Sequence, residues 1–241
     1  MKEVHKNKNA VIQFKDVVRT YGEGEAVQYA VNHVDFTIYE GEFAVILGQS
    51  GAGKSTVLNM LGGMDQPTNG QVFIDGEKVS SMNERQLSDF RAAKIGFIFQ
   101  FYNLIPSLTA YENVALTKSI VKNAKDAAMA LEEVGLTAHR DKFPAQLSGG
   151  EQQRVSIARA LAKNPRIILG DEPTGALDSE TGKIVLELLQ KQSRQNHHTV
   201  VLVTHNADIA KCADKIIRMK NGKIVEITAN ENPLSVEEVA W

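Results

Sequence analysis

The sequence predicts an α/β fold in which helices cover a buried parallel sheet, and three observations support this fold class. Unbroken apolar runs at 43–47, 167–169 and 200–203 each end at a polar or glycine-rich segment. Runs of this length suit strands that are buried on both faces. A glycine-rich loop joins the first run to a helical pattern, and a longer helical pattern at 109–162 separates it from the later runs. We therefore expect one core with a helical insert.

A small antiparallel layer is expected beside that core. Alternating apolar residues at 11–18 and 31–39 predict half-buried strands. An Asp-Gly pair at 75–76 and an Asn-Gly pair at 221–222 each separate two short apolar runs, and such pairs supply the positive φ angles that tight hairpins need. We expect the first hairpin to join the antiparallel layer, and both hairpins to lie outside the parallel core.

Three stretches have the pattern of a capping box, in which a Ser or Thr is followed three residues later by Glu. They lie at 81–84, 109–112 and 148–151, and each predicts the start of a helix. A chain of 241 residues suits one large domain. The predicted organisation is a domain at 11–228 with its core at 11–100 and 155–228 and a helical subdomain at 101–154, a polar N-terminal tail at 1–10 and a C-terminal tail at 229–241.

Composition limits the partners. The net charge of −2 gives no basic excess, so we expect no nucleic-acid partner. The single cysteine, Cys212, cannot form an intrachain disulfide and is typical of a reducing compartment. The polar N-terminus lacks the apolar stretch of a signal peptide, and no apolar run approaches the roughly 20 residues that span a bilayer. Any role at a membrane is therefore expected to come through a partner.

The glycine-rich loop after the first apolar run is a predicted phosphate site. Glycines allow backbone N–H groups to converge on a phosphate, and the start of the following helix adds about half a positive charge. A lysine in such a loop bridges β- and γ-phosphates, and the next hydroxyl binds Mg²⁺. A plain glycine-rich turn is the alternative that this spacing disfavours. The loop consists of Gly48, Gln49, Ser50, Gly51, Ala52, Gly53, Lys54, Ser55 and Thr56.

Two adjacent acids follow the second apolar run and complete this prediction. Asp171 ends the predicted strand, where it can hold Mg²⁺, which commonly keeps several of its waters. Glu172 lies just beyond the strand, where it can act on an attacking water. Such a pair alone would more often be a solvated loop, but the presence of Lys54 and Ser55 reverses that balance.

These residues, together with Leu-Ser-Gly-Gly-Glu at 147–151, resemble the ATP-binding cassette (ABC) transporter ATPases, from about residue 11 to residue 227. The resemblance implies an α/β fold with a P-loop NTPase core of the RecA-like type, an antiparallel β layer and a helical subdomain. It also implies ATP and Mg²⁺ as cofactors. The 147–151 segment resembles the family's signature motif, in which Ser148, Gly149 and Gly150 bind the γ-phosphate of the nucleotide held by a second subunit.

The resemblance implies further roles for single residues. Gln100 matches a glutamine that contacts Mg²⁺ and the attacking water, and His205 matches a histidine that contacts the γ-phosphate. The residue after this histidine is commonly Asp in the family, whereas this chain has Asn206. Asp178 lies in a loop that crosses to the opposite subunit, and Tyr21 matches the aromatic residue that stacks on adenine. The catalytic set implied in this way is Glu172, His205, Gln100 and Lys54, and the metal set is Ser55, Gln100 and Asp171.

Within the family, the stretches at 99–106, 171–178 and 22–25 resemble the branch of macrolide exporters and lipoprotein-release systems. This resemblance implies an ATP-hydrolysing subunit whose dimer closure drives an integral-membrane permease for export or mechanical work. The implied partners are a second copy and the permease, and the implied location is the cytoplasmic face of the cell membrane. The alternatives are a non-transport ABC ATPase, a slow ATP-switched regulatory module and a P-loop kinase for small molecules.

Overall fold

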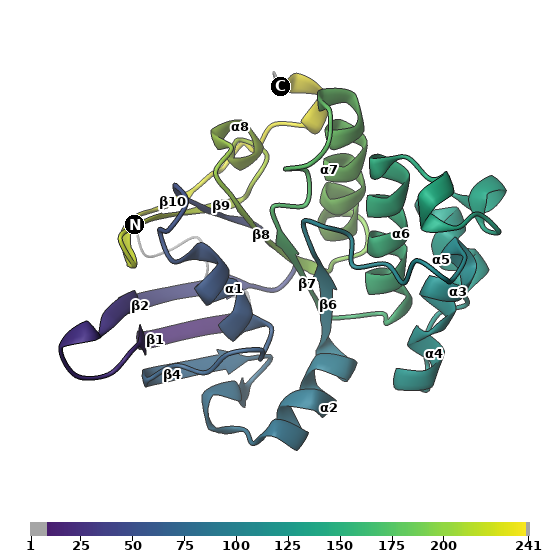
Figure 1. The fold of residues 1–241 in the computed structure, drawn as a ribbon. Coiled ribbons are helices and arrows are strands. Elements are labelled where there is room, and N and C mark those ends of the chain that lie inside the picture. Colours follow the sequence, from purple (N-terminus) through teal and green to yellow (C-terminus); the bar gives the residue numbers. More distant parts are fainter. Residues whose placement is uncertain (1–8, 240–241) are drawn as a thin grey trace.

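The computed structural model describes residues 9–239, which form two sheets and the helices that cover them (Figure 1). The larger sheet has six strands in the order β10-β9-β3-β8-β7-β6, and the smaller has four in the order β2-β1-β4-β5. The strands are β1 (Ala10–Tyr21), β2 (Gln28–Tyr39), β3 (Phe43–Leu47), β4 (Asn69–Ile74), β5 (Glu77–Lys78), β6 (Ile95–Ile98), β7 (Ile167–Asp171), β8 (Thr199–Thr204), β9 (Lys215–Lys220) and β10 (Lys223–Ala229).

The three apolar runs are the parallel strands that the sequence predicts. β3 pairs in parallel with β8, and β7 lies in parallel between β8 and β6. All five residues of β3 and all six of β8 are buried. The expectation for the second hairpin is wrong, because β9 pairs in parallel with β3 and only β10 runs antiparallel to β9. This hairpin extends the core sheet instead of lying outside it.

Two apolar clusters lie on opposite faces of the large sheet. Along β3, Phe43, Val45 and Leu47 belong to the cluster on the α-helical side, which also contains residues of α3, α5, α6 and α7. Ala44 and Ile46 belong to the second cluster, which contains residues of α1 and of the four-stranded sheet. Successive side chains of a strand point to opposite faces, so one short strand contributes to both cores. Figure 1 shows α1 and the small sheet on one side and α6 and α7 on the other.

The small sheet confirms the predicted antiparallel layer. β1 pairs with β2 and with β4, and the Asp-Gly turn at 75–76 joins β4 to β5. Phe14 and Phe36 lie opposite each other in the register, and their rings stack with centroids 4.4 Å apart. Such an aromatic pair stabilises a sheet beyond its buried area.

The helices begin at two of the three predicted capping boxes. The boxes of Thr109 and Ser148 are both formed, whereas the prediction at 81–84 is wrong. Ser81 donates its hydroxyl to the Lys78 carbonyl within a 3₁₀ turn, and Asn83 is the residue that caps the next helix. The helices are α1 (Lys54–Leu61), α2 (Glu84–Lys94), α3 (Ala110–Ala115), α4 (Thr117–Ile120), α5 (Ala127–Glu133), α6 (Gly149–Ala162), α7 (Ser179–Arg194) and α8 (Ala207–Ala210), with 3₁₀ turns η1 (Gly24–Ala26), η2 (Val79–Ser81), η3 (Thr137–His139), η4 (Pro144–Gln146) and η5 (Val236–Glu238).

The domain boundaries remain predictions, and the structure adds three observations about them. α6 runs without a break through the boundary proposed at 154/155. At the C-terminus, Val236 and Val239 are buried in the cluster that contains α7, and Gln190 of α7 donates to the carbonyl of Leu234. Residues 1–8 and 240–241 of the two predicted tails lie outside the described residues. Within residues 9–239, no helix is long and apolar enough to cross a bilayer.

Candidate functional site

A cavity of about 480 Å³ lies at the carboxyl ends of the parallel strands. Ligands of open α/β sheets bind at this edge, because the loops that follow the strands converge there. Most of the residues that the sequence predicts for phosphate and metal binding line this cavity together. Its lining consists of Tyr21, Gln28, Tyr29, Ala30, Ser50, Gly51, Gly53, Lys54, Ser55, Thr56, Gln100, Asp171 and Glu172.

The loop between β3 and α1 has a shape that only glycine permits at its end. Gly53, the N-cap of α1, has φ of 97°, and a Cβ atom there would lie 2.3 Å from the Ala30 carbonyl oxygen. At the start of the loop, a Cβ on Gly48 would lie 2.5 Å from the carbonyl oxygen of Met219. The loop is therefore pressed against β2 and β9, and its backbone approaches the cavity without side chains in the way.

Lys54 points back over this loop. Its side chain is only 6% exposed, and its Nζ donates to the Gln49 carbonyl at 3.1 Å. The same Nζ lies 4.0 Å from Oε1 of Glu172. A buried ammonium at the start of a helix, beside free backbone amides, forms a site for a phosphate chain.

Ser55 and Asp171 form the next layer of the cavity. Ser55 donates its hydroxyl to Oδ1 of Asp171 at 3.4 Å. Burial raises the pKa of Asp171, the hydrogen bond from Ser55 opposes this rise, Glu172 adds to it, and Lys54 opposes it. A hydroxyl and a carboxylate are oxygen donors of the kind that Mg²⁺ prefers. No cluster of three or more His, Cys, Asp or Glu side chains suited to a metal occurs within residues 9–239, so a cation here would need further oxygens from substrate or water.

Glu172 has a backbone conformation that is uncommon outside glycine, with φ of 43°. Its amide donates to the carbonyl of Val203, and its Oε2 lies 2.7 Å from Nδ1 of His205. A Cβ added to Gly175 would lie 3.3 Å from Glu172 Oε2 and 3.4 Å from Gln100 Nε2. The side chains of Gln100 and Glu172 therefore meet beside Gly175, and His205 contacts Glu172.

Tyr21 is one of the residues that line the cavity, and its side chain is partly exposed. Its hydroxyl donates to Asp65 at 2.7 Å, and the guanidinium of Arg19 lies over its ring at 4.5 Å. Sequence reasoning missed the neighbouring lining residues Gln28, Tyr29 and Ala30. Neutral residues at the start of a strand carry no spacing signal, so only the fold places them here.

The four predicted site residues at the starts of α6 and α7 lie away from this cavity. Ser148 caps α6 by accepting from the Glu151 amide, and its own amide donates to Glu151 Oε2 at 2.7 Å. Asp178 caps α7 by accepting from the amide and the hydroxyl of Thr181. None of Ser148, Gly149, Gly150 and Asp178 lines the cavity that Lys54 lines. One copy of the described chain therefore does not bring the two predicted phosphate-binding segments together.

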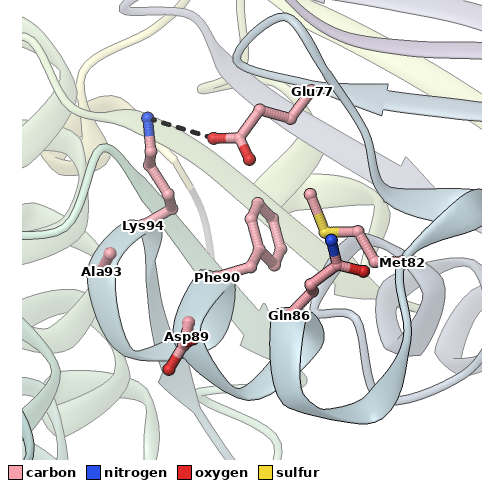
Figure 2. A pocket seen from close by; sticks show the side chains of 7 residues that line it. All are labelled: Glu77, Met82, Gln86, Asp89, Phe90, Ala93 and Lys94. Atoms are coloured by element: carbon pink, nitrogen blue, oxygen red, sulfur yellow. Dashed lines mark ion pairs between the residues drawn. The ribbon is translucent and has the colours of Figure 1, made fainter.

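Two other cavities lack this constellation. One, of about 320 Å³, lies behind the loop and is lined by Gly48, Gln49 and Ala52 together with the hairpin of β9 and β10. The other, of about 310 Å³, lies between α2 and β5, where Figure 2 shows Phe90 between Met82 and Lys94. Lys94 is paired there with Glu77 at 3.7 Å. Neither cavity is lined by Lys54 or by the Ser55–Asp171 pair, so neither is the candidate site.

The comparisons with known proteins agree with this geometry. Residues 31–175 match the family model of ABC transporters. The chain belongs to the ABC transporter family of ATP-binding proteins. One relative is an uncharacterized ABC transporter ATP-binding protein, MJ0796 of Methanocaldococcus jannaschii, which is 46% identical over 89% of this chain and 95% of that protein.

A second relative is the macrolide export ATP-binding/permease protein MacB of Mannheimia succiniciproducens. It is 46% identical over 90% of this chain, but the chain spans only 34% of that protein's length. Among solved structures, a dimeric post-hydrolysis state of MJ0796 bound to ADP and Pi has a TM-score of 0.84 at 43% identity, covering 92% of this chain and 99% of that one. The family assignment confirms the predicted fold class, and the protein is an ATPase component of an ABC transporter with ATP and Mg²⁺ as cofactors.

Proposed function

We propose that the cavity at the carboxyl ends of β3 and β7 binds Mg-ATP. The observation that supports this best is the convergence of Lys54, Ser55 and Asp171 on one glycine loop. Lys54 and the amides of the loop residues that line the cavity, from Ser50 to Thr56 apart from Ala52, bind the phosphates, and Tyr21 stacks on the adenine. Base–aromatic stacking of this kind is worth about 1–3 kcal/mol and tolerates different bases.

Ser55, Asp171 and Gln100 would hold Mg²⁺ in this site. The metal supplies positive charge that offsets the charge on the transferring phosphoryl group. The raised pKa of Asp171 fits this role. Burial disfavours the charged carboxylate, and a bound cation would stabilise that charged form.

Glu172 orients or polarises the attacking water, and His205 contacts the γ-phosphate. In the structure the two side chains are hydrogen-bonding neighbours, and Glu172 is also close to Lys54. We infer that the phosphate competes with Glu172 for Lys54 and His205 when the nucleotide binds. Glu172 is then released toward the water beside the γ-phosphate.

We further propose that two copies of the chain enclose two ATP molecules. Ser148, Gly149 and Gly150 start a helix that does not line their own cavity, and Asp178 caps the neighbouring helix α7, whose Thr181 lies against Gly150. A head-to-tail twofold dimer brings these groups to the phosphates in the partner's cavity. The dimeric state of the MJ0796 cassette supports this arrangement.

The permease is expected to bind the segment that follows Gln100. Phe101 is 75% exposed, and Ile105 and Ile120 are also exposed. Exposed apolar groups of this size on one lobe suit a protein interface. In this proposal the chain is cytoplasmic and is held at the inner face of the cell membrane by the permease.

The direction proposed is export or mechanical work. The similarity to MacB supports it, because that relative is named as a macrolide export protein that combines ATPase and permease. A slow regulatory switch is the second candidate, because ATP binding could break the contact between Glu172 and His205 and so signal the bound state without rapid hydrolysis. Steady-state ATP turnover with and without the permease separates these two functions.

Glu172→Gln tests the hydrolytic role. The variant keeps the shape of the side chain but loses its charge, so ATP binding is retained while turnover falls by about 10²–10³-fold, as for loss of one preorganised catalytic group. With Mg-ATP it is expected to elute as a dimer in size-exclusion chromatography. Glu187→Gln, a substitution in α7 outside the cavity, is the matched control and should turn over normally. Unchanged turnover in Glu172→Gln would show that the role given to Glu172 is wrong.

A further inference from the structure

Gln153 is a buried polar residue of α6 that the functions described so far do not use. Its side chain is 0% exposed. Its Nε2 donates to the carbonyl of Pro173 at 2.7 Å and lies 3.4 Å from the carbonyl of Phe99. Its Oε1 has no hydrogen-bond partner within the described part of the chain. A buried acceptor without a partner is unfavourable, so the side chain carries a folding cost that its two donated hydrogen bonds have to offset.

The two carbonyls that Gln153 binds lie next to two of the proposed catalytic residues. Phe99 directly precedes Gln100, and Pro173 directly follows Glu172. Gln100 and Glu172 flank Gly175 from two sides, as the positions around an added Cβ atom show. One amide group therefore ties together the backbones that carry both side chains.

The loop after β7 needs such support. Glu172 has a positive φ, which a non-glycine residue keeps only when its surroundings hold it. The Glu172 amide is held by Val203, and its carbonyl accepts from the Gly175 amide. Pro173 has no backbone N–H, so the bond from Gln153 to its carbonyl is the anchor on the far side of Glu172.

The same helix also holds the residues just after Gln100. Arg159 donates to the carbonyls of Tyr102 and Asn103 at 3.0 and 2.6 Å. Both residues have positive φ, of 58° and 50°. α6 therefore binds the loop after β6 at two residues, Gln153 and Arg159, and Gln153 binds the part of the loop next to Gln100.

We propose that Gln153 is a positioning residue for ATP hydrolysis, which sets the distance between Gln100 and Glu172 by binding the backbone beside each of them. This inference rests on the proposed roles of Gln100 and Glu172. The glycine loop is held by β2 and β9 instead of α6, so Gln153 does not act on phosphate binding. Its loss should therefore slow the chemical step far more than it weakens ATP binding, in which Gln100 is one of three groups that would hold Mg²⁺.

Gln153→Met is the test, because methionine has a similar length and no donor. The control is Gln192→Met in α7, where the lost glutamine is equally buried and binds Glu133 and Asn196 far from the cavity. We expect kcat of Gln153→Met to fall by about ten- to a hundredfold, as for a small misplacement of reacting groups. KM for ATP should stay within about twofold of the original value, and Gln192→Met should keep both constants.

The Tm of both variants is measured without nucleotide, to show whether each variant is folded. If Gln153→Met does not fold, Gln153→Asn replaces it, because asparagine keeps the amide but is too short to reach both carbonyls. A kcat of the folded Gln153 variant equal to that of Gln192→Met, or a parallel change in kcat and KM, would overturn the inference. Glu172→Gln is measured alongside: full turnover in that variant refutes the proposed function itself, whereas its loss with normal Gln153→Met kinetics refutes only the role of Gln153.

Discussion

Substitutions at Ser148 should separate a structural contact within one chain from a catalytic contact in the partner's site. The hydroxyl accepts from the Glu151 amide at 3.3 Å and so caps α6. Alanine removes the cap and the hydroxyl together. Aspartate is as good an N-cap as serine, but it places a negative charge where the γ-phosphate of the partner's ATP is expected.

The sizes of the two effects follow from these contacts. Loss of an N-cap of this kind destabilises a protein by about 1 kcal/mol. In a chain of 241 residues this lowers Tm by about 2–4 °C. Ser148→Ala should therefore melt earlier without nucleotide, whereas Ser148→Asp should melt at or above the original temperature. Both variants should lose about 10²–10³-fold in turnover, as for one missing preorganised donor.

The assay mixes each Ser148 variant with Lys54→Ala protein. In a mixed dimer, one site joins the normal Lys54 of one chain to the normal Ser148 of the other, so ATP turnover should reappear on mixing. Each protein alone is the control and should stay inactive. Normal turnover by Ser148→Asp, or no recovery in the mixtures, would refute the shared site, and an unchanged Tm in Ser148→Ala would refute the capping role.

Two further predictions concern carboxylates. Burial raises the pKa of Asp171 above its ordinary 3.8, so the contribution of this group to stability is present below pH 3.8 and is lost as pH rises through the folded-state pKa. At pH 7, Asp171→Asn should therefore unfold at a higher urea concentration than the original protein, while it loses Mg²⁺-dependent turnover. A lower urea midpoint would contradict this. For Glu151, burial raises the pKa, but hydrogen bonds from Ser148 and the nearby His139 and Lys142 outweigh it and leave the pKa below 4.5, so its contribution is present above about pH 4.5 and is lost as pH falls through the folded-state pKa. Glu151→Gln should show a weaker loss of Tm between pH 5 and 3, and an identical pH dependence would contradict this.

The sequence predicts the parts of the fold whose apolar pattern is regular. β3, β7 and β8 are unbroken apolar runs, and their end residues carry the predicted chemistry. The Asn-Gly turn at 221–222 predicts a hairpin outside the core, and β9 also carries Lys215, Arg218 and Lys220 among its apolar residues. In the structure Lys215 is only 6% exposed, and its Nζ pairs with Glu42 at 2.8 Å and donates to the Thr37 carbonyl. A buried ion pair between distant segments satisfies the charge, and no local pattern indicates it.

The candidate site was predictable where one short motif carries several groups. The loop with Lys54 and Ser55 is such a motif, and the structure places both residues beside Asp171 as expected. Gln28 and Gln153 were not predicted as functional residues. Their positions depend on which segments lie next to them, and neither has a charge or spacing that marks it in the sequence.

The division of the apolar residues into two clusters has a consequence for local opening of the protein. α3 and α5 contribute only to the cluster on the α-helical side, with residues such as Val114 and Leu131. Partial detachment of these helices would expose that cluster alone and leave Val57 and Leu58 of α1 covered by the small sheet. Amide hydrogens of α3 and α5 should therefore exchange with solvent by a lower-energy route than those of α1. The lobe that meets a partner can then fluctuate while the loop that holds the phosphates keeps its shape.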